Sequence, residues 1–401
     1  MTRRYHLHLP GLMYIGLTLM VAVIAMNRQN NLLFAILGVL LAALLISGVV
    51  SGLMMRGLRV RRLLPRDGAV GEPLTVRYAV TNRNRIFPVF NIHIEERPVA
   101  GLCGWARLMA PAQTWVLHIG PKETVHGEAI FWPSRRGKAR FDRLRVWTTF
   151  PFGIVKKSIT ISRPQHALIY PLLYELRRNV VNDVAPQGVA GAKISQRARD
   201  PIAGDDYYGM REFRPGDSLR HIAWKRTAAL DQLVCIERTR PAPPRLRVVV
   251  NLTKPTAELR VDPADEHSPR QLEELAISLA ASIIHAADRN GFEVGLSLPG
   301  TGLPSHLIRH SQWHRAKMLA ALAGIDLDAP RPADLVQAAT SAERVGQIVI
   351  HPDRVEPSIG RANAWHLTAR QMNSLVLRSI GWDPHEAPPS APPGQRREAA
   401  A

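Results

Sequence analysis

The chain has 401 residues, 46% of them apolar, which is enough for two or three domains with cores of their own. Its two cysteines exclude a disulfide framework and suit a reducing compartment. A net charge of +19 narrows the partners to nucleic acid, an anionic membrane surface or an acidic protein. The basic residues lack the interleaved aromatic residues typical of RNA-binding segments, so nucleic acid is the least favoured of the three.

Two uncharged apolar runs near the N-terminus, at 11–26 and 32–55, predict a two-helix transmembrane hairpin over residues 1–56. A cleaved signal peptide would explain the first run alone. The second run follows almost at once, however, and no Ala-x-Ala cleavage site comes after Met26. Both ends of the hairpin carry basic residues: Arg3, Arg4, Arg56, Arg59, Arg61 and Arg62. Because cytoplasmic flanks carry the positive charge, both termini are expected in the cytoplasm.

Residues 57–165 predict an all-β, sandwich-like domain. Runs rich in β-branched and aromatic residues, such as EPLTVRYAVTN and RFDRLRVWTTF, are separated by Pro, Gly and Asn. His93, His118 and His126 lie in separate predicted strands without the spacing of metal ligands. They are therefore interpreted as ordinary strand residues.

Residues 245–382 alternate between strand and helix patterns. Strands are predicted at 247–252, 292–298 and 347–351, and helices at 269–290, 311–323 and 332–342. This alternation predicts an α/β domain, with a parallel sheet and helices on both of its faces. Residues 166–244 are interpreted as a junction between the two domains. The proline-rich tail 383–401 is expected to be disordered.

The most distinctive stretch of the junction, 209–240, is rich in arginine. Its Arg-Pro-Gly-Asp sequence at 214–217 predicts a turn, and Asp217 is expected to cap a helix over 218–229. The apolar side chains of that helix are expected to face inward, namely Leu219, Ile222 and Ala223. Arg220 and Trp224 are one turn apart in that helix, so a cation–π contact between them is expected.

This stretch resembles the signature of the bacterial domain-of-unknown-function family 58, in which an R-E-Y-x-P-G-D-x-x-R-x-I-x-W-K-x-x-A pattern precedes a strand. The matching positions are Arg211, Glu212, Pro215, Gly216, Asp217, Arg220, Ile222, Trp224, Lys225 and Ala228. Arg214 within the pattern and Glu237 on the following strand complete the candidate interaction residues. The upstream RRGKARFD…FPFG segment and the two-helix anchor also resemble this family, so the resemblance covers most of residues 10–380.

The resemblance implies a C-terminal domain similar to a von Willebrand factor A domain, a Rossmann-like fold that often binds a divalent metal through D-x-S-x-S. The corresponding positions here are Asn251, Thr253 and Pro255, and Lys254 adds a positive charge. Hard cations prefer carboxylate oxygens, so no metal or other cofactor is expected. Asp262 and Asp265 could supply ligands only if the loop were rebuilt.

The resemblance also implies a partner, because members of the family are commonly encoded beside MoxR-type AAA+ ATPases. The expected function is that of a scaffold or interaction protein of the bacterial inner membrane, working with such an ATPase in the assembly or maturation of other proteins. The chain carries no Walker pattern, so ATP hydrolysis would belong to the partner.

Two interpretations of the charged stretch stay open. Its ion pairs could join the β-domain to the α/β domain, or Arg214, Arg220, Trp224 and Lys225 could dock an acidic partner. A catalytic Ser218–His221–Asp217 triad is disfavoured, because Asp217 is adjacent to Ser218 and cannot orient the imidazole. No enzymatic activity is therefore expected. The alternative function is that of a basic protein that binds a membrane surface or nucleic acid.

Overall fold

The computed structural model describes residues 2–7, 9–28, 30–98, 104–177, 181, 206–215, 217–239, 243–260, 267–332, 345–361, 363–382 and 384. The chain forms two compact units, residues 1–172 with 380–401 and residues 173–379, and each is described by itself. The helix expected at 332–342 and the tail expected from 383 lie almost entirely outside the described residues.

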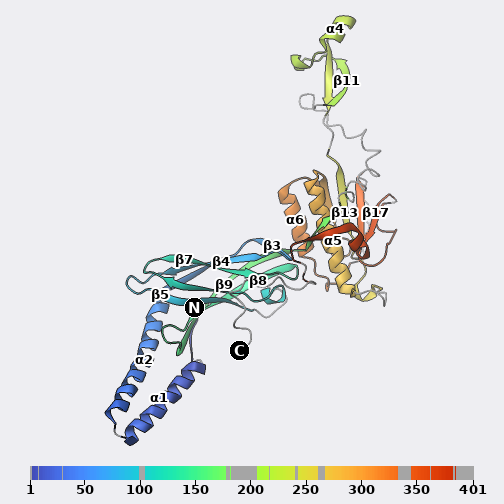
Figure 1. The fold of residues 1–401 in the computed structure, drawn as a ribbon. Helices are drawn as coiled ribbons and strands as arrows, with labels where there is room; N and C mark the ends of the chain where they lie inside the picture. The colour runs from blue at the N-terminus through green and yellow to red at the C-terminus, as the bar shows by residue number, and fades with distance from the viewer. Residues whose placement is uncertain are drawn as a thin grey trace. The chain divides into compact units, whose positions relative to one another are not determined.

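Two apolar helices near the N-terminus confirm the predicted helical pair (Figure 1). Helix α1 spans Leu9–Arg28 and helix α2 spans Asn31–Arg56, and both are long and apolar enough to cross a membrane. Asn30 begins α2 by accepting a hydrogen bond from the backbone of Leu32 at 2.9 Å. The Tyr14 hydroxyl donates to the Leu40 carbonyl at 3.0 Å and ties the two helices together.

The residues before α1 form a strand that the sequence analysis did not anticipate. Strand β1 (Thr2–Leu7) pairs antiparallel with β9 (Val155–Tyr170), so that Leu7 lies opposite Val155. Strand β2, which follows α2, also belongs to this unit. The chain therefore enters α1 and leaves α2 at the same end of the helical pair, as a hairpin requires.

Two sheets make up the β-domain. A six-stranded sheet has the order β1-β9-β8-β5-β6, with β3 parallel to β9, and a three-stranded antiparallel sheet has the order β2-β4-β7. The remaining strands of the domain are β2 (Leu58–Leu63), β3 (Asp67–Ala69), β4 (Leu74–Asn82), β5 (Val89–Arg97), β6 (Gln113–Ile119), β7 (Thr124–Phe131) and β8 (Gly137–Thr148). In β4, buried and less buried residues alternate, which is the pattern of a strand with one face toward a core. Strand β9 continues to Tyr170, past the boundary expected at 165.

The two sheets pack face to face around an aromatic cluster. Trp105, on the short helix η1 (Trp105–Arg107), lies edge-on to Phe131 of β7, with ring centroids 5.5 Å apart. It stacks on Phe141 of β8 at 5.9 Å. All three side chains are buried, so the β-domain has a core of its own, as the sandwich-like prediction requires.

A buried ion pair also joins the sheets. Arg62 of β2 donates to both carboxylate oxygens of Glu96 on β5, at 2.7 and 2.6 Å, and both side chains are fully buried. The Tyr78 hydroxyl of β4 donates to Glu96 at 2.9 Å. Burial raises the pKa of the Glu96 carboxyl, and the bonds from Arg62 and Tyr78 act against that rise. Arg62 is therefore part of the core, although sequence analysis counts it with the charged membrane flank.

A five-stranded mixed sheet forms the centre of the second unit. Its order is β15-β14-β13-β16-β17, with parallel pairing throughout except between β14 and β15. The strands are β13 (Arg245–Val250), β14 (Glu293–Ser297), β15 (His306–Arg309), β16 (Gly346–His351) and β17 (Trp365–Thr368). The three predicted strands are thus confirmed as parallel neighbours, β14, β13 and β16. Two edge strands were not predicted: β17, which is parallel to β16, and β15, which runs antiparallel to β14.

Two long helices accompany the sheet, α5 (Pro269–Arg289) and α6 (Gln312–Ala323). Ser268 and Gln271 form a capping box at the start of α5, and Pro269 occupies its first turn. Arg315 of α6 donates to Asp288 of α5 at 2.6 Å, so the two helices contact each other (Figure 1). The other described elements of this part are β10 (Leu173–Leu176), η3 (Thr256–Glu258), η6 (Ala369–Gln371), α7 (Met372–Leu375) and β18 (Val376–Ile380).

Candidate functional site

The signature stretch folds as a small module of its own, residues 206–239, which we call the signature module. Strands β11 (Asp206–Glu212) and β12 (Val234–Thr239) pair antiparallel. The segment between them holds a short helix η2 (Leu219–His221) and the helix α4 (Trp224–Leu230) (Figure 1).

The single helix expected over 218–229 is wrong, because the chain is extended between η2 and α4. Ile222 forms an isolated bridge with Cys235 of β12, and the Ala223 amide donates to the Val234 carbonyl at 2.8 Å. These bonds to β12 take the place of helical ones. Ile222 and Ala223 are buried as predicted, whereas Leu219 is 67% exposed.

Asp217 closes the turn of the module instead of capping a helix. Its amide donates to the Arg214 carbonyl at 3.0 Å, which confirms a turn at this position. Arg211 donates to both carboxylate oxygens, at 2.6 and 2.8 Å, and the Arg214 amide donates to one of them at 2.9 Å. These hydrogen bonds lower the pKa of Asp217 to about 2, and the bond from Arg211 makes the largest contribution. Arg211 of β11 engages both oxygens and the Arg214 amide engages one of them, so neither oxygen serves to orient His221.

The other signature residues lie mainly on the surface of the module. The exposed ones are Glu212, Arg214, Pro215, Arg220, Trp224, Lys225 and Ala228. Arg220 lies on η2 and Trp224 begins α4, so the two are not spaced one turn apart on a single helix. Gly216 and the side chain of Glu237 lie outside the described residues.

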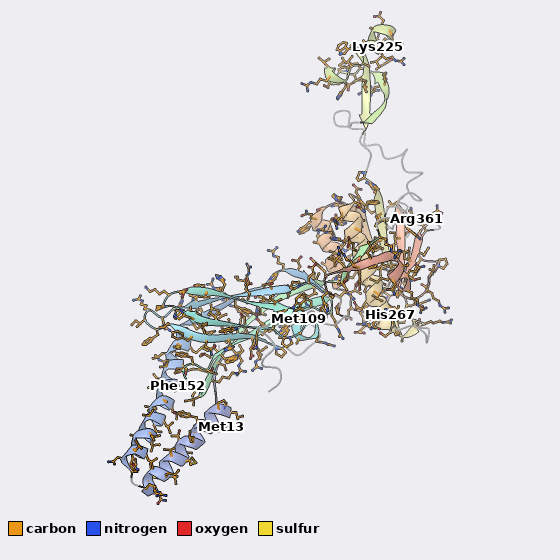
Figure 2. All side chains as sticks on the ribbon, in the orientation of Figure 1. Met13, Met109, Phe152, Lys225, His267 and Arg361 are labelled. Atoms are coloured by element: carbon orange, nitrogen blue, oxygen red, sulfur yellow. The ribbon has the colours of Figure 1, made fainter. Side chains whose placement is uncertain are left out.

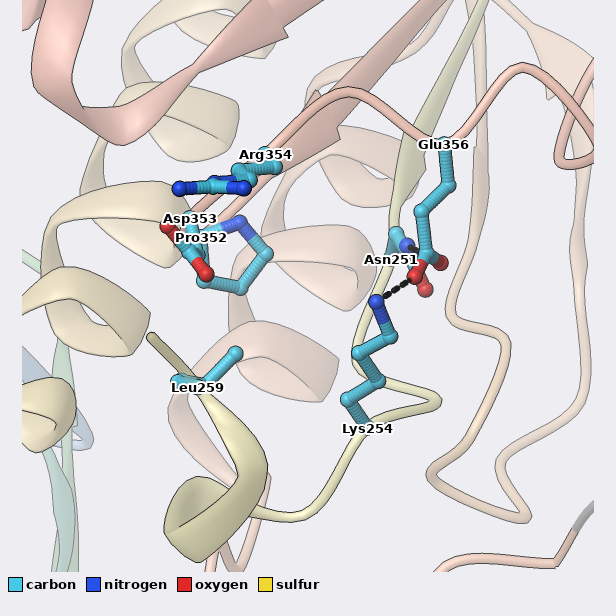
Figure 3. A pocket seen from close by; sticks show the side chains of 7 residues that line it. All are labelled: Asn251, Lys254, Leu259, Pro352, Asp353, Arg354 and Glu356. Atoms are coloured by element: carbon cyan, nitrogen blue, oxygen red, sulfur yellow. Dashed lines mark hydrogen bonds and ion pairs between the residues drawn. The ribbon is translucent and has the colours of Figure 1, made fainter. Parts of the chain in front are cut away.

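A second candidate site lies at the carboxyl ends of β13 and β16. From β13 the chain continues to β14 on one side of β13, whereas the later strand β16 pairs with the other side of β13. The strand order therefore reverses between β13 and β16. Ligands in open α/β sheets bind at such a switch point. A small pocket opens there, and we call it the switch-point pocket (Figure 3). It is lined by Asn251, Lys254, Leu259, Pro352, Asp353, Arg354 and Glu356.

Asn251 organises the switch-point pocket through its carboxamide. The side-chain oxygen accepts from the Thr253 amide at 3.1 Å and from the Thr253 hydroxyl at 2.7 Å. Because the Thr253 amide N–H can only donate, the atom that it contacts is the carboxamide oxygen of Asn251. The carboxamide nitrogen then donates to Glu356 at 2.9 Å and to His351 at 3.1 Å. Lys254 forms an ion pair with Glu356 (Figure 3).

This bonding does not fit a divalent metal held at the position of a D-x-S-x-S motif. The Asn251 oxygen is committed to Thr253, the Lys254 ammonium is paired with Glu356, and Pro255 has no ligand oxygen in its side chain. Within the part of the chain that the structure describes, no group of three or more His, Cys, Asp or Glu side chains could hold a metal ion.

A histidine pair continues the network behind Asn251. His351, which ends β16 and is fully buried, has its Nε2 2.9 Å from Nδ1 of His366 on β17. Since Asn251 donates to His351 Nδ1, the proton of the neutral ring lies on Nε2 and is donated to His366. Burial, with a smaller contribution from His366, lowers the pKa of His351 to about 4. Burial also lowers the pKa of His366, so both rings are neutral at pH 7.

The neutral state of His351 predicts that acid destabilises the α/β unit. The unfolded chain binds a proton near pH 6.5 and the folded one only near pH 4, so stability falls as the pH is lowered between these values. We expect a loss of about 2–3 kcal/mol from this residue, because each unit of pKa shift corresponds to about 1.4 kcal/mol. The measurement is hydrogen exchange of peptides from β16 in the full-length protein at several pH values.

His351→Asn removes the titrating group and is expected to flatten the pH dependence between pH 6.5 and 4. His310→Asn is the matched control, because the His310 side chain is 51% exposed in the same unit. If the stability of His351→Asn fell as steeply between pH 6.5 and 4 as that of the control, the buried neutral pair would be contradicted.

Sequence reasoning missed the residues that complete the switch-point pocket. It considered Asn251 and Lys254 only as evidence against a metal site, and it did not single out His351, Glu356 or His366. The available signal was the position of His351 at the end of the buried run Gln-Ile-Val-Ile-His, since polar residues at the carboxyl ends of parallel strands gather at one edge of the sheet.

The chain is a multidomain protein with a sheet-rich domain and an α/β domain that carries a switch-point pocket. Its two apolar N-terminal helices support membrane association. Residues 209–349 match the family described as "Protein of unknown function DUF58". This segment of the chain is therefore similar to that family. The matched segment includes the signature module from Gly209 onward, strands β13, β14 and β15 of the five-stranded sheet, and the first part of β16.

A relative from Bacillus subtilis (strain 168), described as "Uncharacterized protein YeaD", is 26% identical over 197 residues. That match covers 49% of this chain and 45% of the relative, so the chain spans less than half the length of this curated relative. Its description assigns no activity.

The chain also has weak similarity to two solved structures. The sporulation control protein Spo0M from Bacillus subtilis has a TM-score of 0.17 and 11% identity, covering 39% of this chain and 58% of its own. A GH20 exo-β-N-acetylglucosaminidase from Vibrio harveyi has a TM-score of 0.15 and 9% identity, and the match covers 74% of this chain and 57% of the enzyme's chain. At such scores neither structure supports an argument about fold or function.

Proposed function

We propose that this protein is a membrane-anchored interaction protein that docks an acidic protein partner through its signature module. The observation that carries this proposal is Trp224, whose side chain is 63% exposed on a module that other residues hold together. The Arg211–Asp217 pair and the buried Ile222 stabilise the module, and they leave Trp224 free of a core role. Exposed tryptophan and arginine side chains are the ones most enriched at interface hot spots.

Charge and apolar surface together favour an acidic, partly apolar partner. Exposed basic side chains surround Trp224 in the sequence of the module: Arg214, Arg220, Lys225 and Arg226. Two leucines nearby are also exposed, Leu219 at 67% and Leu230 at 57%. Such a surface pairs apolar contact area with positive potential, which speeds association with an acidic partner. The same features suit an anionic lipid surface, and the test below separates the two.

We place the protein in the bacterial inner membrane with both termini in the cytoplasm, and the family resemblance supports a MoxR-type AAA+ ATPase as the partner. The basic flanks and the shared end at which the chain enters α1 and leaves α2 support this topology. In this proposal the protein presents other proteins to the ATPase for assembly or maturation. The domain boundaries at 56, 165, 244 and 382 stay predictions.

A von Willebrand A-like identity for the α/β domain is part of the proposal. Counted in chain order, its strands are arranged 3-2-1-4-5, which is the order of a Rossmann-like sheet without its sixth strand. The third strand is the antiparallel edge, β15. If the identity holds, the bonding of Asn251 and Lys254 makes this a member that works without the metal.

The test is crosslinking and capture of partners from native membranes by the full-length protein. Trp224→Ala is expected to reduce capture of the docked partner by about thirtyfold, the effect of a hot spot of about 2 kcal/mol. Trp313→Ala is the matched control, since Trp313 is 71% exposed on α6, outside the module. Unchanged circular dichroism establishes that both variants are folded.

Equal capture of partners by Trp224→Ala and Trp313→Ala would show that the signature module is not the docking surface. Specific capture of a protein other than an AAA+ ATPase would keep the docking surface and discard the ATPase. Equal capture, together with binding to anionic vesicles that only Trp224→Ala weakens, would favour the membrane-surface alternative.

A further inference from the structure

We infer that three loops at one end of the β-domain contact the lipid headgroup region and form a second membrane contact beside the helices. These loops are residues 83–88, 120–123 and 149–154, and we call them the loop collar. The inference rests on the membrane anchoring in the proposed function. It adds a surface of the β-domain that binds the bilayer.

The strand registers place the whole loop collar at the end where the helices join the β-domain. The chain enters α1 after Leu7, which pairs with Val155 directly after the loop 149–154. It leaves α2 into Leu58, which pairs with Asn82 directly before the loop 83–88. The third loop, 120–123, precedes β7, whose first residue Thr124 pairs with Thr81 at the same end.

Direct contacts hold the loop collar against the end of α2. The Asn84 carboxamide donates to the Leu53 carbonyl in the last turn of α2 at 3.4 Å, and the Arg83 amide donates to the Gly57 carbonyl at 2.8 Å. The Lys122 amide donates to the Asn84 carbonyl at 3.1 Å and joins the second loop to the first. Phe152 of the third loop lies on the side of the β-domain from which the helices extend (Figure 2).

The length of α2 places these contacts at the level of the headgroups. At 1.5 Å per residue its 26 residues span about 39 Å, whereas the hydrocarbon core of a bilayer is about 30 Å thick. The ends of α2 therefore reach into the headgroup region. Because the loop collar is bonded to the last turn of α2, it lies in the same layer.

The exposed side chains of the loop collar suit that layer. Ile86 is 77% exposed, Phe87 49% and Phe152 55%, although each is a large apolar residue. Exposed basic side chains accompany them, namely Arg83, Arg85 and Lys122, with Glu123 as the acidic residue of these loops. Apolar and aromatic side chains mixed with Lys and Arg are typical of segments that bind in the membrane interface.

The experiment measures how deeply single sites reach into a bilayer. Full-length protein with Cys103→Ala and Cys235→Ala carries one new cysteine, labelled with the fluorophore NBD and placed in nanodiscs of phosphatidylcholine and phosphatidylglycerol. The sites are Ile86→Cys and Phe152→Cys in the loop collar, Leu45→Cys in α2, and Arg135→Cys in the exposed loop between β7 and β8 at the opposite end of the β-domain. Spin-labelled lipids quench a fluorophore that lies within the bilayer.

Quenching at Ile86→Cys and Phe152→Cys is expected to exceed that at Arg135→Cys by at least about twofold, with blue-shifted emission, as for a site in the membrane interface. Strong quenching at Leu45→Cys with no difference between the loop collar and Arg135→Cys would overturn the inference while the anchoring stands. Absence of quenching at Leu45→Cys would overturn the anchoring itself. The parent without a new cysteine establishes the labelling background.

Discussion

Replacing Arg62 by alanine is expected to lower the free energy of unfolding of the β-domain by about 3–5 kcal/mol, because the change leaves a buried carboxylate without its partner. Both side chains of the Arg62–Glu96 pair are fully buried between the two sheets. Arg62 also donates to the Phe141 carbonyl at 3.1 Å and to the Arg163 carbonyl at 2.8 Å. These carbonyls would lose a donor as well, which adds to the cost.

The measurement is hydrogen exchange of peptides from β4 and β5 in the full-length protein, which reports the stability of the β-domain apart from the other unit. Arg61→Ala is the matched control, since Arg61 is the exposed neighbour on the same strand, and a change within about 0.5 kcal/mol is expected. The double variant Arg62→Met/Glu96→Leu removes both charges and is expected to recover most of the loss. A loss in Arg62→Ala no larger than in Arg61→Ala would contradict the role of the pair.

Arg331→Ala is expected to destabilise the α/β unit by a similar amount, about 3–5 kcal/mol. Arg331 donates at 2.5 Å to Glu273, a fully buried carboxylate on α5. Its guanidinium also donates to the Leu252 carbonyl at 3.2 Å and to the Lys254 carbonyl, and these residues belong to the loop that follows β13. One side chain thus connects the buried face of α5 to the loop that carries Lys254 of the switch-point pocket.

Hydrogen exchange distinguishes this effect from general destabilisation. Peptides covering 252–256 are expected to exchange faster than those of β13 in Arg331→Ala, because the loop loses its ties to α5 before the sheet opens. Arg270→Ala is the matched control. Arg270 pairs with Asp328 through two bonds, but their side chains are 42% and 78% exposed, so a change of about 0–1 kcal/mol is expected. Equal losses in the two variants would contradict the buried tie.

The positions of Arg62 and Arg331 illustrate what charge patterns in the sequence leave undetermined. Arg62 belongs to a run of arginines after an apolar helix, and counting charges assigns it to the membrane flank. Its strand alternates between buried and exposed residues, and the register with β4 turns Arg62 inward toward Glu96. A partner 34 positions away in the sequence decides whether such a charge lies in water or in a core.

The signature module shows the same limit for local structure. The spacing of Leu219, Ile222 and Ala223 predicted one helix, and the turn at Asp217 was predicted correctly. Pairing of Ile222 with Cys235 interrupts the helix, because a residue that bridges to a strand adopts an extended backbone. That competition depends on β12, which lies outside the window in which periodicity is read.

The sequence by itself determined the apolar helical pair, the change from strand-rich to alternating α/β patterns, and the resemblance of the signature stretch to a known family. These features follow from local composition and periodicity, which act within a few turns of chain. Only the tertiary structure decided that residues 2–7 pair with β9, that Arg62 is buried, and that Asn251, Glu356 and the histidine pair meet at the switch point. Each depends on strand pairing between residues far apart in sequence, and the register that brings them together is set by packing of the whole domain.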